Sequence, residues 1–273
     1  MNEPAEFSLA NRVAIVTGAG RGLGRAMALG LAAAGCRVAI TAARATQEIA
    51  AVAAEVGADR MLALTADVTH EEDCASVVAS TLARFGRLDI LVNNAGRGMK
   101  YVSERFLEEP TRFWEVRPDV FRMVIDTNVN GPFLMARTAV PPMLRAGWGR
   151  IVNVSMNRET MRRVGFSPYG PSKAALESET AIWAQDLAGT GVTVNAILPG
   201  GATATGMIPA GVPDRVRASL LKPEVIVPAL LWLVSTRSDG VTGKRVIANR
   251  WRDGDVSPAA DALEDAGWIP AAG

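Results

Sequence analysis

The chain has 273 residues, 49% of them hydrophobic and 21% charged, which is enough for one well-buried core, so we expect a single domain over 1–273. Lys and Arg total 29 and Asp and Glu total 28, and this balance argues against a nucleic-acid partner or an acidic membrane. The chain has one histidine, His70, and two cysteines, Cys36 and Cys74. Several His or Cys ligands for zinc cannot be assembled from so few, so we predict no metal site and no disulfide scaffold.

Apolar, β-branched runs alternate along the chain with longer segments of helical pattern. The predicted strands are 12–17, 37–41, 61–65, 88–93, 150–155, 192–198 and 244–248. The predicted helices are 22–34, 46–56, 71–85, 119–146, 168–189 and 224–235. Most strand runs are continuously apolar, as in strands buried on both faces. The repeated order predicts a doubly wound α/β fold, a parallel sheet of about seven strands with helices on both faces.

The beginning of the chain carries Glu3 and Glu6 and has no apolar run, which argues against a signal peptide. The apolar stretches elsewhere fall far short of the ~20 residues that a membrane helix needs. We therefore expect a soluble, cytoplasmic protein without a membrane partner.

A glycine-rich turn follows the first predicted strand and precedes an Ala-rich helix. It consists of Thr17, Gly18, Ala19, Gly20, Arg21, Gly22, Leu23 and Gly24. Glycines allow a tight turn and a close backbone approach to a pyrophosphate, while the amides of the helix start face the anion. A purely structural turn is the alternative. Its position after the first strand favours nucleotide binding.

Several motifs together resemble those of the short-chain dehydrogenases/reductases, over roughly residues 9–248. They are Thr17-Gly18 with Gly22 and Gly24, Asp67-Val68, Asn93-Asn94-Ala95-Gly96, Asn128, Tyr169-Gly170-Pro171-Ser172-Lys173 and Pro199-Gly200, in the family's order and spacing. The resemblance implies a Rossmann-like fold and an NAD(P)-dependent oxidoreductase. It also implies a homo-oligomer, either a dimer or a tetramer.

Tyr169 and Lys173 are four residues apart on a predicted helix, so their side chains share a face. A neighbouring ammonium lowers the pKa of a phenol, which is ~10 when unperturbed, and a phenol so tuned exchanges protons with a carbonyl or alcohol. By resemblance, Tyr169 is the acid/base and also contacts the cofactor, Lys173 also holds the nicotinamide ribose, and Asn128 belongs to a proton relay. The alternatives are an ordinary helix face for the pair and a local cap or kink for Asn128.

Further cofactor contacts are implied by the resemblance. They comprise Gly18, Gly20, Arg21, Gly22, Leu23 and Gly24, then Asp67 and Val68, Asn94, Ala95 and Gly96, and Pro199, Gly200 and Ala202. Asp67 would accept a hydrogen bond from the adenine amino group, and the last group would form the nicotinamide-side loop. Structural turns, and a helix-capping role for Asp67, are the alternatives.

The end of the second predicted strand, 40–44, bears on the choice of cofactor. An acid that holds a ribose 2'-hydroxyl is typical of NAD sites, and none appears before Glu48. Arg44 and Arg21 would suit a 2'-phosphate, because guanidinium binds phosphate well. The sequence therefore favours NADP over NAD.

The family pattern has a serine thirteen residues before the tyrosine, whereas this chain has Met156 there, which places Met156 in the substrate pocket. Met offers no donor hydrogen. Ser155 is adjacent, but it would face the other way in a regular strand. Three explanations stay open: Ser155 is redirected as a catalytic donor, Asn157 or a substrate group replaces it, or catalysis is impaired.

Two segments depart from the family pattern. Residues 97–118 are interpreted as an insertion, either an amphipathic helix or a substrate lid or pocket wall. The tail 249–273 would fold over the pocket or a neighbouring subunit, or be partly disordered. Overall, the sequence predicts an enzyme that interconverts a small secondary alcohol and a ketone by hydride transfer. The alternative is an impaired nucleotide-binding protein on the same fold.

Overall fold

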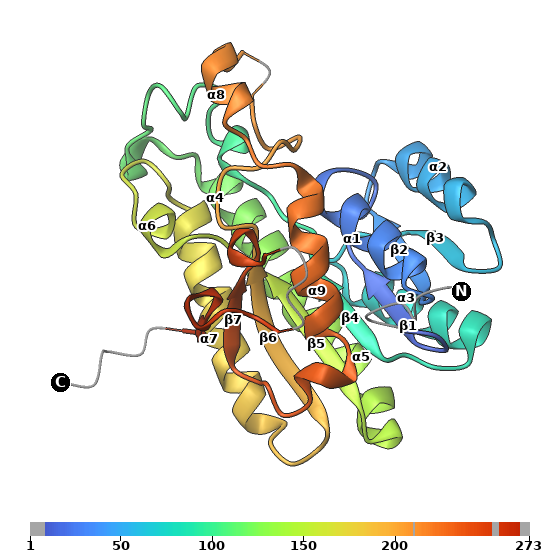
Figure 1. Cartoon of the computed structure of the whole chain (residues 1–273). Coiled ribbons are helices and arrows are strands. Elements are labelled where there is room, and N and C mark those ends of the chain that lie inside the picture. Colours follow the sequence, from blue (N-terminus) through green and yellow to red (C-terminus); the bar gives the residue numbers. More distant parts are fainter. Residues whose placement is uncertain (1–8, 210, 253–256, 268–273) are drawn as a thin grey trace.

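A single eight-stranded sheet forms the centre of the molecule (Figure 1). In this computed structural model, residues 9–209, 211–252 and 257–267 are described. The strands are β1 (Val13–Val16), β2 (Arg37–Ala42), β3 (Met61–Thr65), β4 (Ile90–Asn93), β5 (Gly149–Val154), β6 (Val192–Leu198), β7 (Lys244–Ile247) and β8 (Leu263–Asp265). Their order across the sheet is β3-β2-β1-β4-β5-β6-β7-β8. Strands β1 to β7 pair in parallel, so their carboxyl ends share one edge, and β1 and β4 lie side by side where the strand order reverses.

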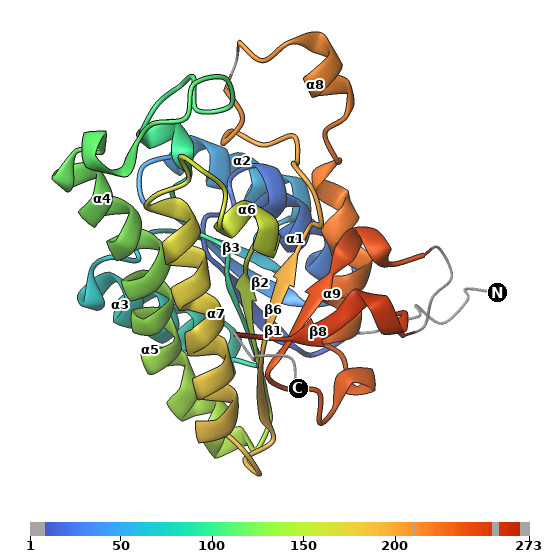
Figure 2. The same cartoon turned by 90° about the vertical axis from the view of Figure 1, so that its left-hand side faces the viewer.

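Helices cover both faces of the sheet. The long elements are α1 (Gly22–Ala33), α2 (Thr46–Val56), α3 (Glu71–Phe85), α4 (Pro118–Ile125), α5 (Gly131–Ala146), α7 (Tyr169–Asp186) and α9 (Val227–Leu233). Helices α1, α2 and α9 pack on one face through a core that includes Met27, Val52 and Leu230. Helices α3, α5 and α7 pack on the other through a core that includes Val78 and Met135, and Figure 2 shows the two layers. The predicted doubly wound architecture is confirmed.

Shorter elements lie in the connections. They are η1 (Met99–Tyr101), η2 (Phe113–Glu115), the π-helical segment η3 (Asp126–Asn130), α6 (Arg158–Met161), α8 (Asp214–Ala218), η4 (Pro223–Ile226), η5 (Thr236–Ser238), η6 (Ala248–Arg250) and η7 (Ala260–Ala262). The helix predicted over 119–146 is one run made of α4, η3 and α5. Residues 97–117 hold the two short 3-10 helices η1 and η2, and α4 begins at Pro118, so no amphipathic helix runs through 97–118.

The C-terminal part adds a strand that the sequence pattern did not predict. Strand β8 pairs antiparallel with β7 through Lys244 and Asp265, and an ion pair joins the side chains of the same two residues. The sheet therefore has one strand more than predicted, and the described part of the tail covers the edge of β7. Trp268 lies outside the described residues.

Other expectations concern single residues and the membrane. Cys36 and Cys74 are both free and buried, and burial raises the pKa of each thiol to about 12. His70 is exposed at the start of α3 and lies 3.7 Å from the Asp73 carboxylate. Among the described helices, none is long and apolar enough to cross a membrane.

Candidate active site

The glycine turn between β1 and α1 has a backbone that only small residues fit. Gly18 and Gly22 have positive φ angles of 64° and 55°, which favour glycine. A Cβ on Gly24 would stand 2.3 Å from the carbonyl oxygen of Gly18 and 2.5 Å from Nδ2 of Asn94. The turn therefore lies in close contact with the neighbouring loop after β4. Leu23, the remaining member of the turn assigned to the cofactor, is half-buried against the core.

Thr17 and Asn94 join the loops after β1 and β4. The hydroxyl of Thr17 accepts hydrogen bonds from the backbone amides of Asn94 and Ala95, both at 3.0 Å. In the other direction, Nδ2 of Asn94 donates to the carbonyl oxygens of Thr17 and Gly18 at 2.8 and 2.9 Å. Two loops that are about 75 residues apart in the chain thus form one rigid edge at the switch point, where ligands bind in such sheets.

Arg21 and Arg44, the residues predicted to meet a 2'-phosphate, are both exposed. Nη1 of Arg21 lies 3.5 Å from Oε1 of Glu48, and Arg44 forms no ion pair within the described part of the chain. Glu48 also lies against the glycine turn, because a Cβ on Gly20 would stand 2.9 Å from the Cβ of Glu48. The position of this acid beside the turn follows from α2, which begins at Thr46.

Asp67 and Val68 follow β3. Oδ1 of Asp67 accepts from the amide and the hydroxyl of Thr69 at 3.0 and 2.8 Å. Partial burial opposes ionisation of Asp67, but these hydrogen bonds outweigh it and lower the pKa of the carboxyl. Val68 is buried and packs against Gly131 at the start of α5. The half-buried Asp67 carboxylate is therefore charged and oriented by its own turn.

Tyr169 and Lys173 lie together at the start of α7, as their spacing predicts. Nζ of Lys173 lies 6.0 Å from the centre of the Tyr169 ring and donates to the carbonyl oxygen of Val154 at 2.7 Å. Burial raises the pKa of Tyr169 to about 12. Burial also lowers the pKa of Lys173 to about 8, with the nearby Glu177 carboxylate opposing this shift. The predicted lowering of the phenol pKa by Lys173 is not present in this structure, because desolvation dominates.

Asn128 lies in the π-helical segment η3 and is fully buried. Its Oδ1 accepts from the Arg97 amide at 2.8 Å, and its Nδ2 donates to the Arg97 carbonyl and to Oγ of Ser172, both at 2.9 Å. It therefore ties the segment after Gly96 to α7, one residue before Lys173. The helical run is therefore interrupted at Asn128 by a π-helical segment rather than continuing as a regular α-helix.

A buried ion-pair network, made of Ser155, Glu177, Arg245 and Glu264, lies under the loop after β5. Oγ of Ser155 donates to Oε1 of Glu177 at 2.6 Å, and Nε of Arg245 donates to the same oxygen at 3.0 Å. Arg245 also donates to Glu264 at 2.6 Å and to the carbonyl oxygen of Met156 at 2.8 Å. A serine hydroxyl has one hydrogen, and here Glu177 takes it. Ser155 therefore offers no hydrogen to a substrate in this arrangement, which argues against the first of the three explanations, a redirected Ser155.

Asn157 and the loop after β6 meet beside Met156. Nδ2 of Asn157 donates to the carbonyl oxygen of Gly200 at 3.1 Å, and Asn249 donates to the same oxygen at 3.3 Å. Gly200 has a φ of 91°, and a Cβ there would overlap the Asn249 side chain. Pro199 accepts from the Asn249 amide at 3.1 Å, and Ala202 accepts from the Leu221 amide at 2.8 Å. The loop implied for the nicotinamide side is thus held in one conformation.

Sequence reasoning missed Thr205 and Met207, which come from the connection after β6. The Tyr169 hydroxyl donates a weak hydrogen bond to Sδ of Met207 at 4.0 Å, and Met207 also lies against Gly98. Thr205 lies against Gly22, because a Cβ on that glycine would stand 3.0 Å from its Cγ2. No motif marks these residues, since their placement depends on how the whole loop folds back. Within the described residues, no cluster of three or more His, Cys, Asp or Glu could hold a metal ion.

The chain is similar in sequence to reductases and in structure to a solved reductase of the same kind. The chain is 35% identical over 195 residues to a 3-oxoacyl-[acyl-carrier-protein] reductase from Synechocystis, covering 71% of this chain and 75% of the relative. It is 33% identical over 249 residues to an acetoacetyl-CoA reductase from Shinella zoogloeoides, covering 88% and 97%. Among solved structures, it is similar to a 3-ketoacyl-(acyl-carrier-protein) reductase from Brucella melitensis complexed with NADH. The TM-score is 0.78 and the identity 32%, over 88% of this chain and 97% of that one.

The family model described as short chain dehydrogenase matches residues 12–214, which span the sheet from β1 to β6 with the glycine turn and the Tyr169–Lys173 pair. The doubly wound, Rossmann-like sheet agrees with this match. The chain therefore belongs to the short-chain dehydrogenase family.

Proposed function

We propose that the protein is an NAD(P)-dependent oxidoreductase that interconverts a small secondary alcohol and a ketone. The observation that carries the proposal is the Tyr169–Lys173 pair, which the fold brings to the same region as the glycine turn through Met207 and Thr205. The names of two relatives, a 3-oxoacyl reductase and an acetoacetyl-CoA reductase, describe the reduction of ketones and support this reaction class.

The residues present fit a nicotinamide dinucleotide. The side chain at the N-cap of α1, Arg21, makes no capping hydrogen bond, so the first backbone amides of this helix are available to a pyrophosphate. Asn94, Ala95 and Gly96 would border the adenosine ribose, Asp67 and Val68 the adenine, and Pro199, Gly200 and Ala202 the nicotinamide. When bound, the dinucleotide supplies or accepts the hydride.

The proton chemistry rests on Tyr169. Because burial raises its pKa to about 12, the phenol keeps its proton at neutral pH and can donate it to the oxygen of a ketone. Lys173, with its pKa lowered to about 8, is still largely charged at pH 7 and would stabilise the phenolate that remains. In the alcohol-oxidising direction the same group, as phenolate, would accept the proton of the alcohol.

The cofactor preference that we propose is NADP. Arg44 is exposed and has no ion-pair partner within the described residues, so it is available to a 2'-phosphate. Arg21 is shared with Glu48, at 3.5 Å. Glu48 beside Gly20 weakens this preference, because a carboxylate near the ribose favours a free 2'-hydroxyl.

Met156 supports a second candidate, an impaired nucleotide-binding protein. Ser155 is held by Glu177, so neither residue at this point of the loop offers a side-chain hydrogen to a substrate oxygen. Asn157 is the nearest amide in sequence, and its Nδ2 already donates to Gly200. Loss of one hydrogen-bond donor to the transition state lowers the rate of an enzyme by ~10²–10³. A protein without the serine is therefore expected to turn over more slowly than a family member that has it.

The test measures the binding of both cofactors and the turnover that distinguishes the two candidate functions. Binding of NADPH and of NADH is titrated first. A protein that binds neither of the two contradicts the proposal. Nicotinamide absorbance is then followed across a panel of ketones and alcohols for the wild type and for Met156→Ser. A gain of about 10² in kcat for the variant supports the impaired protein, whereas a loss of rate shows that the methionine belongs to a working pocket.

We further propose a homo-oligomer formed through α5 and α7. Phe133 and Ile182 are 46% and 52% exposed on these helices, beside an apolar groove lined by Val140, Trp183 and Leu187. Exposed apolar surface of this kind is typical of an interface between subunits. Light scattering of the full chain checks the proposal, and a monomer across the micromolar range contradicts it.

A further inference from the structure

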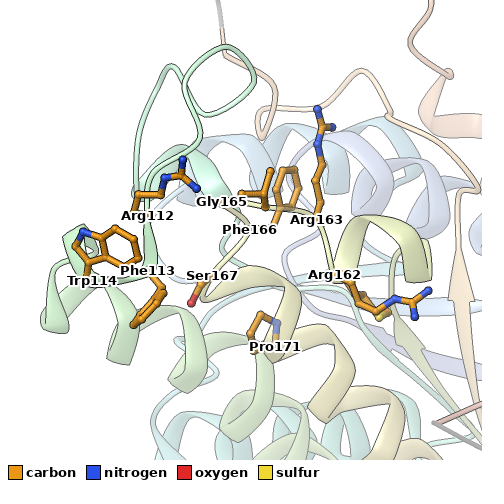
Figure 3. A pocket seen from close by; sticks show the side chains of 11 residues that line it. Arg112, Phe113, Trp114, Arg162, Arg163, Gly165, Phe166, Ser167 and Pro171 are labelled. Atoms are coloured by element: carbon orange, nitrogen blue, oxygen red, sulfur yellow. The ribbon is translucent and has the colours of Figure 1, made fainter.

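The insertion forms one wall of a pocket beside the start of α7. The pocket has a volume of about 300 Å³ and lies between residues 112–114 and the segment 161–171. Its lining residues are Arg112, Phe113, Trp114, Met161, Arg162, Arg163, Val164, Gly165, Phe166, Ser167 and Pro171. In Figure 3, the Arg112 side chain extends from the insertion toward Gly165, with Phe113 and Trp114 beside it. We name this site the aromatic–arginine pocket.

The apolar walls of the aromatic–arginine pocket are open to solvent. Phe113 is 72% exposed, Trp114 is 69% exposed and Val164 is 59% exposed. The rings of Phe113 and Trp114 meet edge to face at 5.0 Å, so they form one surface. Large apolar side chains rarely gather at such exposure unless a ligand or partner covers them. Their flat faces suit a ring or another planar group.

Among the residues that the structure describes, the charged lining of the pocket is basic: Arg112, Arg162 and Arg163 line it, and no carboxylate does. The guanidinium of Arg163 lies 5.4 Å from the ring centre of Phe166, a cation–π contact that holds it at the pocket. The nearest acid in sequence, Glu115, accepts a hydrogen bond from the backbone amide of Arg112. Guanidinium groups beside aromatic rings recognise a carboxylate or phosphate on an apolar body.

The pocket borders the start of α7, the helix that carries the proposed acid/base. Ser167 and Pro171 line it and stand two residues on either side of Tyr169. The Gly170 amide donates to the carbonyl oxygen of Phe166 at 2.7 Å, and a Cβ on Gly170 would stand 2.1 Å from the carbonyl oxygen of Met161. A group held in the pocket therefore contacts the segment that orients Tyr169.

We propose that the aromatic–arginine pocket is a substrate subsite that holds the remote end of the ketone, an apolar or aromatic body bearing a carboxylate or phosphate. The proposal rests on the oxidoreductase function above, which it deepens by naming a substrate class. Arg112 and Arg163 supply the positive charge that attracts the anion, and Phe113 and Trp114 cover the apolar body. The insertion then acts as the pocket wall that the sequence offered as an alternative to a helix.

A binding test separates the subsite from activity. The probe is anilinonaphthalene sulfonate, an anionic aromatic dye, and its matched neutral partner is phenylnaphthylamine. In the variant carrying Arg112→Gln and Arg163→Gln, the anionic dye should bind about tenfold or more weakly, while the neutral dye changes less than about twofold. The control is Arg105→Gln, on the same insertion but paired with Glu109, which should change neither. Equal loss of both dyes, or no loss, overturns the proposal.

Two further outcomes complete the binding test. Benzoate and phenyl phosphate are each used to displace the anionic dye from the wild type, which tells a carboxylate site from a phosphate site. Displacement by neither overturns the proposal. The wild type is also titrated with the dye at several protein concentrations. If the dye binds only at concentrations low enough for an oligomer to dissociate, a second copy of the chain covers these side chains, and the proposal is overturned.

A kinetic test links the pocket to turnover. The substrates are acetylbenzoate and its neutral methyl ester, which present the same aryl ketone with and without the anion. The double arginine variant should raise KM for acetylbenzoate about tenfold, leave its kcat nearly unchanged and leave the ester unaffected. Equal effects on both ketones overturn the subsite. If the wild type reduces no ketone at all, the proposed function fails, and the dye titration still decides whether the pocket binds anions.

Discussion

Around Gly24 and Asn94 the site is assembled from backbone groups, whereas around Met156 it is assembled from charged side chains. In the first region, amides and carbonyls of two loops bond through Thr17 and Asn94. In the second, Arg245 reaches the carbonyl oxygen of Met156 from β7, which lies 89 residues further along the chain. The first arrangement depends on glycines at set positions, and the second on buried charges that must stay paired.

This difference has energetic consequences. The region around Gly24 and Asn94 is disrupted when an added side chain clashes with its backbone, so its sensitive positions are glycines. A buried ion-pair network fails when one partner is removed, because the remaining charge stays desolvated. The dinucleotide side should therefore respond to added volume, and the Met156 side to lost charge.

The largest effect is expected from Arg245→Met, which leaves Glu177 buried without its cation. The side chains of Arg245 and Glu177 are only 3% and 2% exposed. Urea unfolding should show a loss of about 3–5 kcal/mol in the free energy of unfolding. The double variant with Glu177→Met should recover most of this loss, since both charges are then absent. A single variant within about 1 kcal/mol of wild type would mean that the network tolerates an unpaired charge.

Gly24→Ala probes the backbone side of the comparison. The added Cβ would stand 2.3 Å from the Gly18 carbonyl oxygen, so the glycine turn must shift. Fluorescence titration with NADPH should show an affinity about 100-fold weaker, equivalent to about 2.7 kcal/mol. Gly211→Ala, at a position with open space around it, is the control and should bind the dinucleotide as wild type does. Unchanged affinity in Gly24→Ala would show that the turn does not contact the dinucleotide.

A pH dependence follows from Lys173, whose folded pKa of about 8 lies below its ordinary value of 10.5. Between these values the unfolded chain binds more protons at this residue than the folded chain, so stability rises with pH across that window. The unfolding free energy of the wild type, measured relative to that of Lys173→Met, should therefore rise by about 2 kcal/mol from pH 8 to pH 10. A flat difference would indicate that Lys173 is solvated or fully paired.

Local pattern accounts for most of the sheet and its helices. The predicted bounds 46–56, 61–65, 71–85 and 192–198 agree with the structure, because continuous apolar runs and helical periodicity are properties of neighbouring residues. The glycine turn and the spacing of Tyr169 and Lys173 are likewise local. The sequence thus marks the glycine turn by its local pattern, whereas the other positions of the backbone half come from the family resemblance.

Long-range contacts account for what the sequence could not show. Strand β8 has only three residues, two of them acidic, and forms by pairing with β7 rather than by its own pattern. Glu177 and Arg245 are 68 residues apart, and nothing in either segment predicts their contact. Met207 reaches Tyr169 only because the loop after β6 folds back. The substrate side of the site therefore required the structure.

Replacement of Tyr169 by Phe tests the central claim most directly, because it removes only the hydroxyl proposed to move the proton. For any ketone that the wild type reduces, turnover should fall by about 10²–10⁴ in the variant. Its affinity for NADPH should stay within about threefold of wild type, since the glycine turn and Lys173 are untouched. A variant that binds NADPH normally and keeps its rate within about tenfold of wild type would contradict Tyr169 as the acid/base.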